Sequence, residues 1–139
     1  MSTEESPKQF LDFLGTGESL IQQTYRRVRK IFEPEHIFVV THANYADLTS
    51  THLSELPVKN IILEPLRRNT GPCIAYAAMK IKKRDPKANI FITPADHLIV
   101  DEDAFERQIR KGLEKTDSSD CFVTIGIKPN KPETGYGYI

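Results

Sequence analysis

The chain lacks several features that would point to common functional classes. Its 139 residues carry 19 basic and 19 acidic side chains, so no excess of positive charge favours nucleic acid or an anionic membrane as a partner. No hydrophobic run approaches the roughly 20 residues that a membrane-spanning helix needs. Cys73 and Cys121 are the only cysteines, and they have no metal-ligand spacing and predict no disulfide framework. The remaining composition is that of an ordinary globular protein, and the length of the chain fits one domain.

The two cysteines and the first residues also bear on location. Residues 1–5 are acidic and polar, unlike a secretory signal. Neither cysteine has a neighbouring base that would make it a nucleophile. We therefore expect a cytoplasmic protein with reduced thiols, with neither nucleic acid nor a membrane as its partner.

Helical and strand patterns alternate along the chain. Ser19 and Gln22 have the spacing of a capping box, and apolar residues follow on one helical face. Thr70 is placed as the cap of a later helix, in which Pro72 is tolerated in the first turn. The alternation predicts an α/β protein with a mostly parallel sheet. Helices are expected from Ser19, at 44–53, from Thr70 and from 101, and strands at 36–41, 60–63, 89–92 and 121–127.

Residues 93–97 follow one of these predicted strands, at the sheet edge where α/β proteins place ligands. This short run reads Thr-Pro-Ala-Asp-His. Asp96 has two readings. It could be a Mg²⁺ ligand, since Mg²⁺ binds one or two carboxylates together with substrate phosphates. It could equally cap the turn by accepting a backbone N–H.

A second unusual loop, residues 64–72, follows the predicted strand at 60–63. Asn69 and Thr70 stand at a helix start, where free N–H groups attract anions but where both residue types are also ordinary caps. The carboxylate of Glu64 could accept two hydrogen bonds from the N1–H and exocyclic amine of guanine, a paired-donor edge that adenine lacks. The alternative is a solvated side chain at a strand end.

Two further features could contact a ligand. Lys8, ahead of the first helix, is a compact charge suited to a phosphate, although an exposed lysine needs no such role. Gly135 and Gly137 could let a ligand approach bare backbone, or could simply serve turns.

Taken together, these runs resemble the mannose-1-phosphate guanylyltransferase family, also called GDP-mannose pyrophosphorylases. They extend along the whole chain in the family's order, which is more specific than any single motif. Gly71 stands where the family usually has alanine, a mild departure. The matching stretches are residues 7–11, 19–25, 64–65, 68–72, 93–97, 126–129 and 132–139.

The resemblance implies a Rossmann-like, three-layer α/β nucleotidyltransferase fold. It also implies that GTP and mannose 1-phosphate react to give GDP-mannose and pyrophosphate, with Mg²⁺ as cofactor and catalysis mostly by positioning and charge neutralisation. Asp96 is similar to the family's metal ligand and Lys8 to its phosphate-binding lysine, and both are expected to be catalytic. The implied nucleotide-binding residues are Glu64, Pro65, Arg68, Asn69, Thr70, Pro94 and Ala95, and the implied sugar-binding residues are Gly137 and Tyr138.

The ends of the chain depart from the family pattern. Family members carry a strand and a glycine-rich loop just ahead of the stretch that matches 7–11, and they continue beyond the position of Ile139. Residues 1–139 are therefore expected to be a partial catalytic domain, truncated at both ends, that is catalytically silent and poorly stable alone. A transferase for another sugar phosphate or base stays an alternative, as does a non-catalytic module that folds with a partner. The oligomeric state is left open, a homo-oligomer included.

Overall fold

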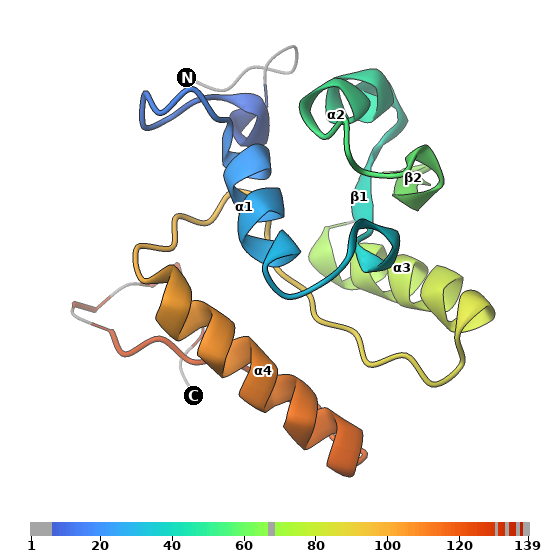
Figure 1. Ribbon diagram of the computed structural model, residues 1–139, viewed down its shortest axis with the longest axis vertical. Helices are drawn as coiled ribbons and strands as arrows, with labels where there is room; N and C mark the ends of the chain where they lie inside the picture. The colour runs from blue at the N-terminus through green and yellow to red at the C-terminus, as the bar shows by residue number, and fades with distance from the viewer. Residues whose placement is uncertain (1–6, 67–68, 130, 133, 136, 138–139) are drawn as a thin grey trace.

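The computed structural model describes residues 7–66, 69–129, 131–132, 134–135 and 137. Within them, helices surround a short parallel sheet, which confirms the α/β class (Figure 1). Four short 3₁₀ turns, at Lys8–Phe10, Pro34–His36, Ala43–Tyr45 and Val58–Asn60, lie between the larger elements. The helices and strands are α1 Leu20–Arg29, β1 Val39–His42, α2 Ala46–His52, β2 Ile61–Glu64, α3 Thr70–Arg84 and α4 Glu102–Ser118.

The two strands of the sheet run parallel and in register. Val39 lies opposite Ile61, and His42 lies opposite Glu64. A parallel pair needs a crossover connection, and α2 supplies it here. His42 and Glu64 therefore end their strands at the same edge of the sheet, which is the edge where ligands of α/β proteins collect.

The start of α1 is fixed by the predicted capping box. The Ser19 N–H donates to Oε1 of Gln22 at 2.9 Å. This bond satisfies a backbone N–H that has no hydrogen-bond partner within the helix. The Ser19 hydroxyl also lies 2.9 Å from Nδ1 of His52, at the end of α2. This contact joins α1 to α2 above the hydrophobic core, whose buried members are Phe10, Ile21, Val28, Ile37, Leu53 and Leu56.

Two predicted strands are wrong. Residues 89–92 and 121–127 are irregular, and the part of the chain that the structure describes contains no strand other than β1 and β2. A strand pattern becomes a strand only when a neighbour satisfies its backbone N–H and C=O groups. Phe91 still packs against the core, but Ile90 and Ile92 are exposed.

The cap of α3 is also corrected. Asn69, not Thr70, is the N-cap residue, and its side chain makes no capping hydrogen bond. Its φ of 63° lies in the left-handed region, which asparagine tolerates better than most residues. Among the described helices, none is both long and apolar enough to cross a membrane.

Candidate nucleotide-binding site

Lys8 and Asp96 are 88 positions apart in the sequence, and the fold brings them together. Nζ of Lys8 lies 3.4 Å from Oδ2 of Asp96. Both side chains are open to solvent, with 49% of Lys8 and 41% of Asp96 exposed. The pair therefore presents an accessible cation and an accessible carboxylate, which could each meet part of an incoming ligand.

The turn that carries Asp96 is held by the side of α1. Oγ1 of Thr24 donates to the carbonyl oxygen of Ala95 at 3.2 Å. Nη2 of Arg27 donates to the carbonyl oxygen of His97, also at 3.2 Å. The backbone carbonyls on both sides of Asp96 are thus hydrogen-bonded to one helix.

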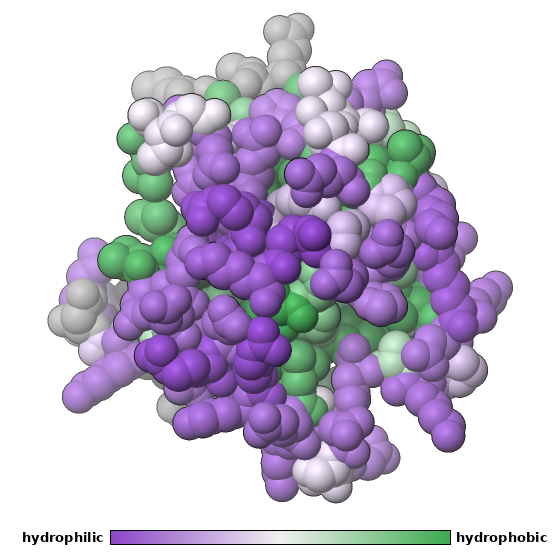
Figure 2. Space-filling view, in the orientation of Figure 1, coloured by the Kyte–Doolittle hydropathy of each residue, from purple (hydrophilic) through white to green (hydrophobic). Residues whose placement is uncertain are grey.

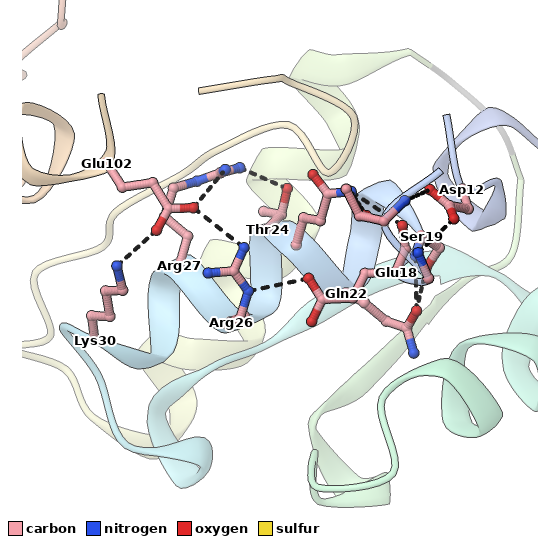
Figure 3. Close-up of polar contacts among 12 residues, drawn as sticks. Asp12, Glu18, Ser19, Gln22, Thr24, Arg26, Arg27, Lys30 and Glu102 are labelled. Carbon is pink, nitrogen blue, oxygen red and sulfur yellow. Dashed lines mark hydrogen bonds and ion pairs between the residues drawn. The ribbon is translucent and has the colours of Figure 1, made fainter. Parts of the chain in front are cut away.

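Arg27 belongs to a cluster of charges around Glu102, at the start of α4 (Figure 3). The Glu102 carboxylate receives Lys30 at 2.7 Å and Arg26 at 3.5 Å, and lies 3.9 Å from Arg27. The hydrogen bond from Lys30 is the largest influence that lowers the pKa of Glu102. Burial lowers the pKa of Arg27, since it disfavours the charged form. The cluster fastens α4 to α1.

Glu64 lies at the end of β2, half-buried, near the first turn of α3. Its partner there is Cys73. Burial raises the pKa of the Cys73 thiol, and the charge and hydrogen bond of Glu64 raise it further. The thiol therefore stays protonated and can donate to the carboxylate. Beside this contact, Pro65, Asn69 and Thr70 are exposed, so the face of the loop is open to solvent.

The structure does not bring every predicted site residue together. No hydrogen bond or ion pair within the described ranges joins the Glu64 loop to Lys8 or Asp96. Pro94 is exposed and Ala95 half-buried, next to Asp96. A Cβ added at Gly137 would meet no atom within 4 Å apart from its chain neighbours, so the space around this residue is open. Arg68 and Tyr138 lie outside the described residues.

Thr24 and Arg27 were not predicted as site residues, although the sequence carried a signal. They lie with Leu20 and Gln23 at positions i, i+3, i+4 and i+7 of α1, and all four are buried. This spacing marks one helix face. The face is partly polar, and polar side chains at buried helical positions require partners from elsewhere in the chain.

The surroundings of Asp96 bear on its candidate role as a metal ligand. No cluster of three or more His, Cys, Asp or Glu side chains suited to a metal occurs among the residues described. Mg²⁺ does not require such a cluster, because it usually keeps several waters and binds through one or two carboxylates plus substrate phosphates. The accessible carboxylate of Asp96 fits that mode of binding.

The comparison with protein families places the sequence in a family. The model of the nucleotidyl transferase family matches residues 2–139. The chain therefore belongs to the nucleotidyl transferase family, and the expected fold class is confirmed.

Similar curated proteins indicate which members of this family the chain resembles. A mannose-1-phosphate guanylyltransferase of Escherichia coli K12 is 39% identical over 137 residues, which cover 96% of this chain and 28% of the relative. The xanthan biosynthesis protein XanB of Xanthomonas campestris is 38% identical, over all of this chain and 30% of the relative. The alginate biosynthesis protein AlgA of Pseudomonas aeruginosa is 35% identical, over all of this chain and 29% of the relative. The chain thus spans less than a third of the length of these relatives.

Proposed function

We propose that this chain is part of the catalytic domain of a mannose-1-phosphate guanylyltransferase, acting on GTP and mannose 1-phosphate. The observation that carries the proposal is the accessible Lys8–Asp96 pair on a turn fastened to α1. Its support from the comparisons is the similarity to guanylyltransferases along the whole chain. In the proposed reaction, an oxygen of the sugar phosphate bonds to the α-phosphorus of GTP. The bond between the α- and β-phosphates breaks, and pyrophosphate leaves.

Asp96 would hold Mg²⁺, and Lys8 would bind an oxygen of the triphosphate. When bound, Mg²⁺ supplies charge neutralisation for the phosphates. Lys8 supplies a second positive charge, on a side chain exposed enough to turn from Asp96 toward a ligand. Catalysis by these groups is positioning and electrostatic stabilisation rather than proton transfer.

Glu64 would select guanine. A carboxylate accepts two hydrogen bonds from the N1–H and the exocyclic amine, whereas adenine presents no such pair of donors. The contact with Cys73 restrains the carboxylate at the start of the open 64–70 loop. A site that pairs with specific donors rejects a base that lacks them, because its own polar group is then left unpaired.

The experiment measures GDP-mannose and ADP-mannose formation in the full-length protein that carries these residues. Glu64→Gln replaces one acceptor with a donor, so we expect the preference for GTP over ATP, as a ratio of kcat/KM, to fall by about tenfold or more. Glu55→Gln, at an exposed position away from the loop, is the matched control and should leave the ratio unchanged. An unchanged ratio in Glu64→Gln would refute the role of Glu64.

Domain extent and location belong to the same proposal. Residues 1–139 would form one part of the catalytic domain, working in the cytoplasm where GTP is available.

A further inference from the structure

Asp96 has little to hold its own side chain in place. Its partner in the structure is Lys8, at 3.4 Å, and both side chains are well exposed. Exposed ion pairs of this kind restrain geometry weakly. The position of the Asp96 carboxylate therefore depends on the backbone on either side of it.

That backbone is fixed by two buried side chains of α1. Thr24 is 7% exposed and Arg27 is 3% exposed, and they hydrogen-bond to the carbonyl oxygens of Ala95 and His97. Nη2 of Arg27 also donates to Oγ1 of Thr24 at 3.0 Å (Figure 3). A hydroxyl that accepts from a guanidinium keeps its own proton for another acceptor, so Arg27 directs the Thr24 proton toward Ala95.

Arg27 is itself held on other sides. Its guanidinium lies 5.6 Å from the ring centre of Phe105, and its Nη1 lies 3.9 Å from Glu102. A buried cation is costly unless it is paired and hydrogen-bonded. Glu102 supplies the pairing. Thr24 and the His97 carbonyl accept hydrogen bonds from the guanidinium, whereas Nε of Arg27 has no partner among the described residues. The 95–97 backbone is therefore tied through Arg27 to two helices.

We propose that Thr24 and Arg27 are positioning residues for Asp96, holding its carboxylate where Mg²⁺ and the triphosphate meet. This inference rests on the proposed role of Asp96 in metal binding. Functional side chains must be held within about 0.5 Å of their productive place. Thr24 and Arg27 provide this restraint without touching the ligand.

The test uses the full-length protein that carries these residues and Mn²⁺, a hard cation that binds the same oxygen ligands as Mg²⁺. Paramagnetic broadening of the backbone NMR signals of Ala95 to His97 gives the apparent Mn²⁺ affinity in the presence of GTP. Thr24→Val removes the hydroxyl and keeps the shape, and Thr24→Ser restores the hydroxyl. Thr49→Val is the matched control, since Thr49 is fully buried and its hydroxyl has no partner among the described residues.

We expect Thr24→Val to weaken Mn²⁺ binding by about fivefold, the value of one net hydrogen bond. Thr24→Ser should bind nearly as well as the parent, and Thr49→Val should not differ from it. Arg27→Lys, which keeps the charge and loses the planar fork, should weaken binding similarly, whereas Arg26→Lys should not. The inference is overturned if Thr24→Val lowers the melting temperature but leaves Mn²⁺ affinity unchanged in the folded chain.

A separate outcome tests the proposed function. If the parent chain shows no broadening at Asp96, or if Asp96→Asn broadens equally, the metal role of Asp96 fails. The positioning claim is then decided by ¹⁵N relaxation. Greater mobility of Ala95 to His97 in Thr24→Val, reversed in Thr24→Ser, supports it, and unchanged mobility overturns it.

Discussion

The chain divides into two regions that have similar apolar content but pack very differently. In the first, residues 7–64, the apolar side chains converge on one core between α1, α2 and the sheet. In the second, residues 85–129, Ile109 is the one fully buried apolar side chain among those described. Its exposed apolar residues are Ile90, Ile92, Leu98, Val100, Phe122, Val123, Ile125 and Ile127.

The difference teaches that an apolar pattern needs a partner before it makes a strand. The predicted strands at 36–41 and 60–63 overlap β1 and β2, in which residues 39–42 pair with residues 61–64. Residues 89–92 and 121–127 also carry apolar strand patterns but pair with no strand of the described chain. On the face shown in Figure 2, hydrophobic side chains lie among hydrophilic ones. Such unpaired segments are the places where a chain recruits further strands or aggregates.

The largest contrast is expected from truncating one apolar side chain in each region. Leu53→Ala removes a side chain that is 2% exposed, and we expect the free energy of unfolding to fall by about 2–5 kcal/mol. Ile125→Ala, at a position 45% exposed, should change it by less than about 0.5 kcal/mol. Urea unfolding followed by circular dichroism measures both. Equal losses would mean that the second region is as tightly packed as the first.

A buried amide gives the next contrast. Nδ2 of Asn60 lies 2.9–3.1 Å from the carbonyl oxygens of Pro34, Glu35 and Ile37, and Oδ1 accepts from Arg84. Asn60→Ala leaves these groups unpaired, so it should cost about 2–3 kcal/mol in the same unfolding assay.

Asn89→Ala is the matched change in the second region. The Asn89 amide is exposed and lies 3.4 Å from Asp117, so its removal should cost less than about 0.5 kcal/mol. A comparable loss in both variants would break the contrast between the regions.

The two cysteines give a related contrast in reactivity, between Cys73 in α3, next to Glu64, and Cys121 in the second region. Burial and Glu64 raise the pKa of Cys73, and the thiolate is the reactive form, whereas Cys121 is exposed. Iodoacetamide at pH 8 should therefore modify Cys73 about tenfold more slowly than Cys121, as peptide mass spectrometry can measure. Glu64→Gln should accelerate Cys73 alone. Faster alkylation of both thiols would indicate that the substitution loosens the whole fold instead.

The smallest effect is a pH dependence at the contact between the regions. The pKa of Glu102 is lower in the folded chain than its ordinary value of 4.5, mainly because of Lys30. Its stabilising contribution is therefore present above pH 4.5 and lost as the pH falls through the folded pKa. Glu102→Gln should remove this part of the acid dependence. Glu33→Gln, at a side chain 75% exposed, is the control and should keep this acid dependence. An identical dependence of stability on pH in the parent and both variants would contradict the role given to Glu102.

Local signals in the sequence predicted most of the first region. The capping box of Ser19 and Gln22 is confirmed, because both partners lie within one helical turn. The α/β class follows from the alternation of helical and strand patterns. The helices α3 and α4 begin within one residue of the starts predicted from the capping residues and from the acidic residues of the first turn. The predicted strand at 89–92 is wrong, because a local pattern shows which side chains of a strand would be buried but not which neighbouring strand would pair with it.

The candidate site shows the same limit. Asp96 and Lys8 stood out individually, but their 3.4 Å contact spans 88 positions. The roles of Thr24 and Arg27 depend on the backbone of residues 95–97 passing beside α1. Helical periodicity alone does not predict that path. A polar stripe on a buried helix face is the kind of signal that predicts such contacts without naming their partners.

The most direct test of the central claim is a titration of the full-length protein that carries these residues with GTP and ATP in the presence of Mg²⁺, followed by ¹H–¹⁵N NMR. The account predicts that GTP shifts signals in both strand-exit loops, around Asn69 and around Asp96. It predicts that ATP shifts the Asp96 loop but has a smaller effect beside Glu64. Equal shifts with both nucleotides beside Glu64, or no shift at Asp96 with either, would contradict it.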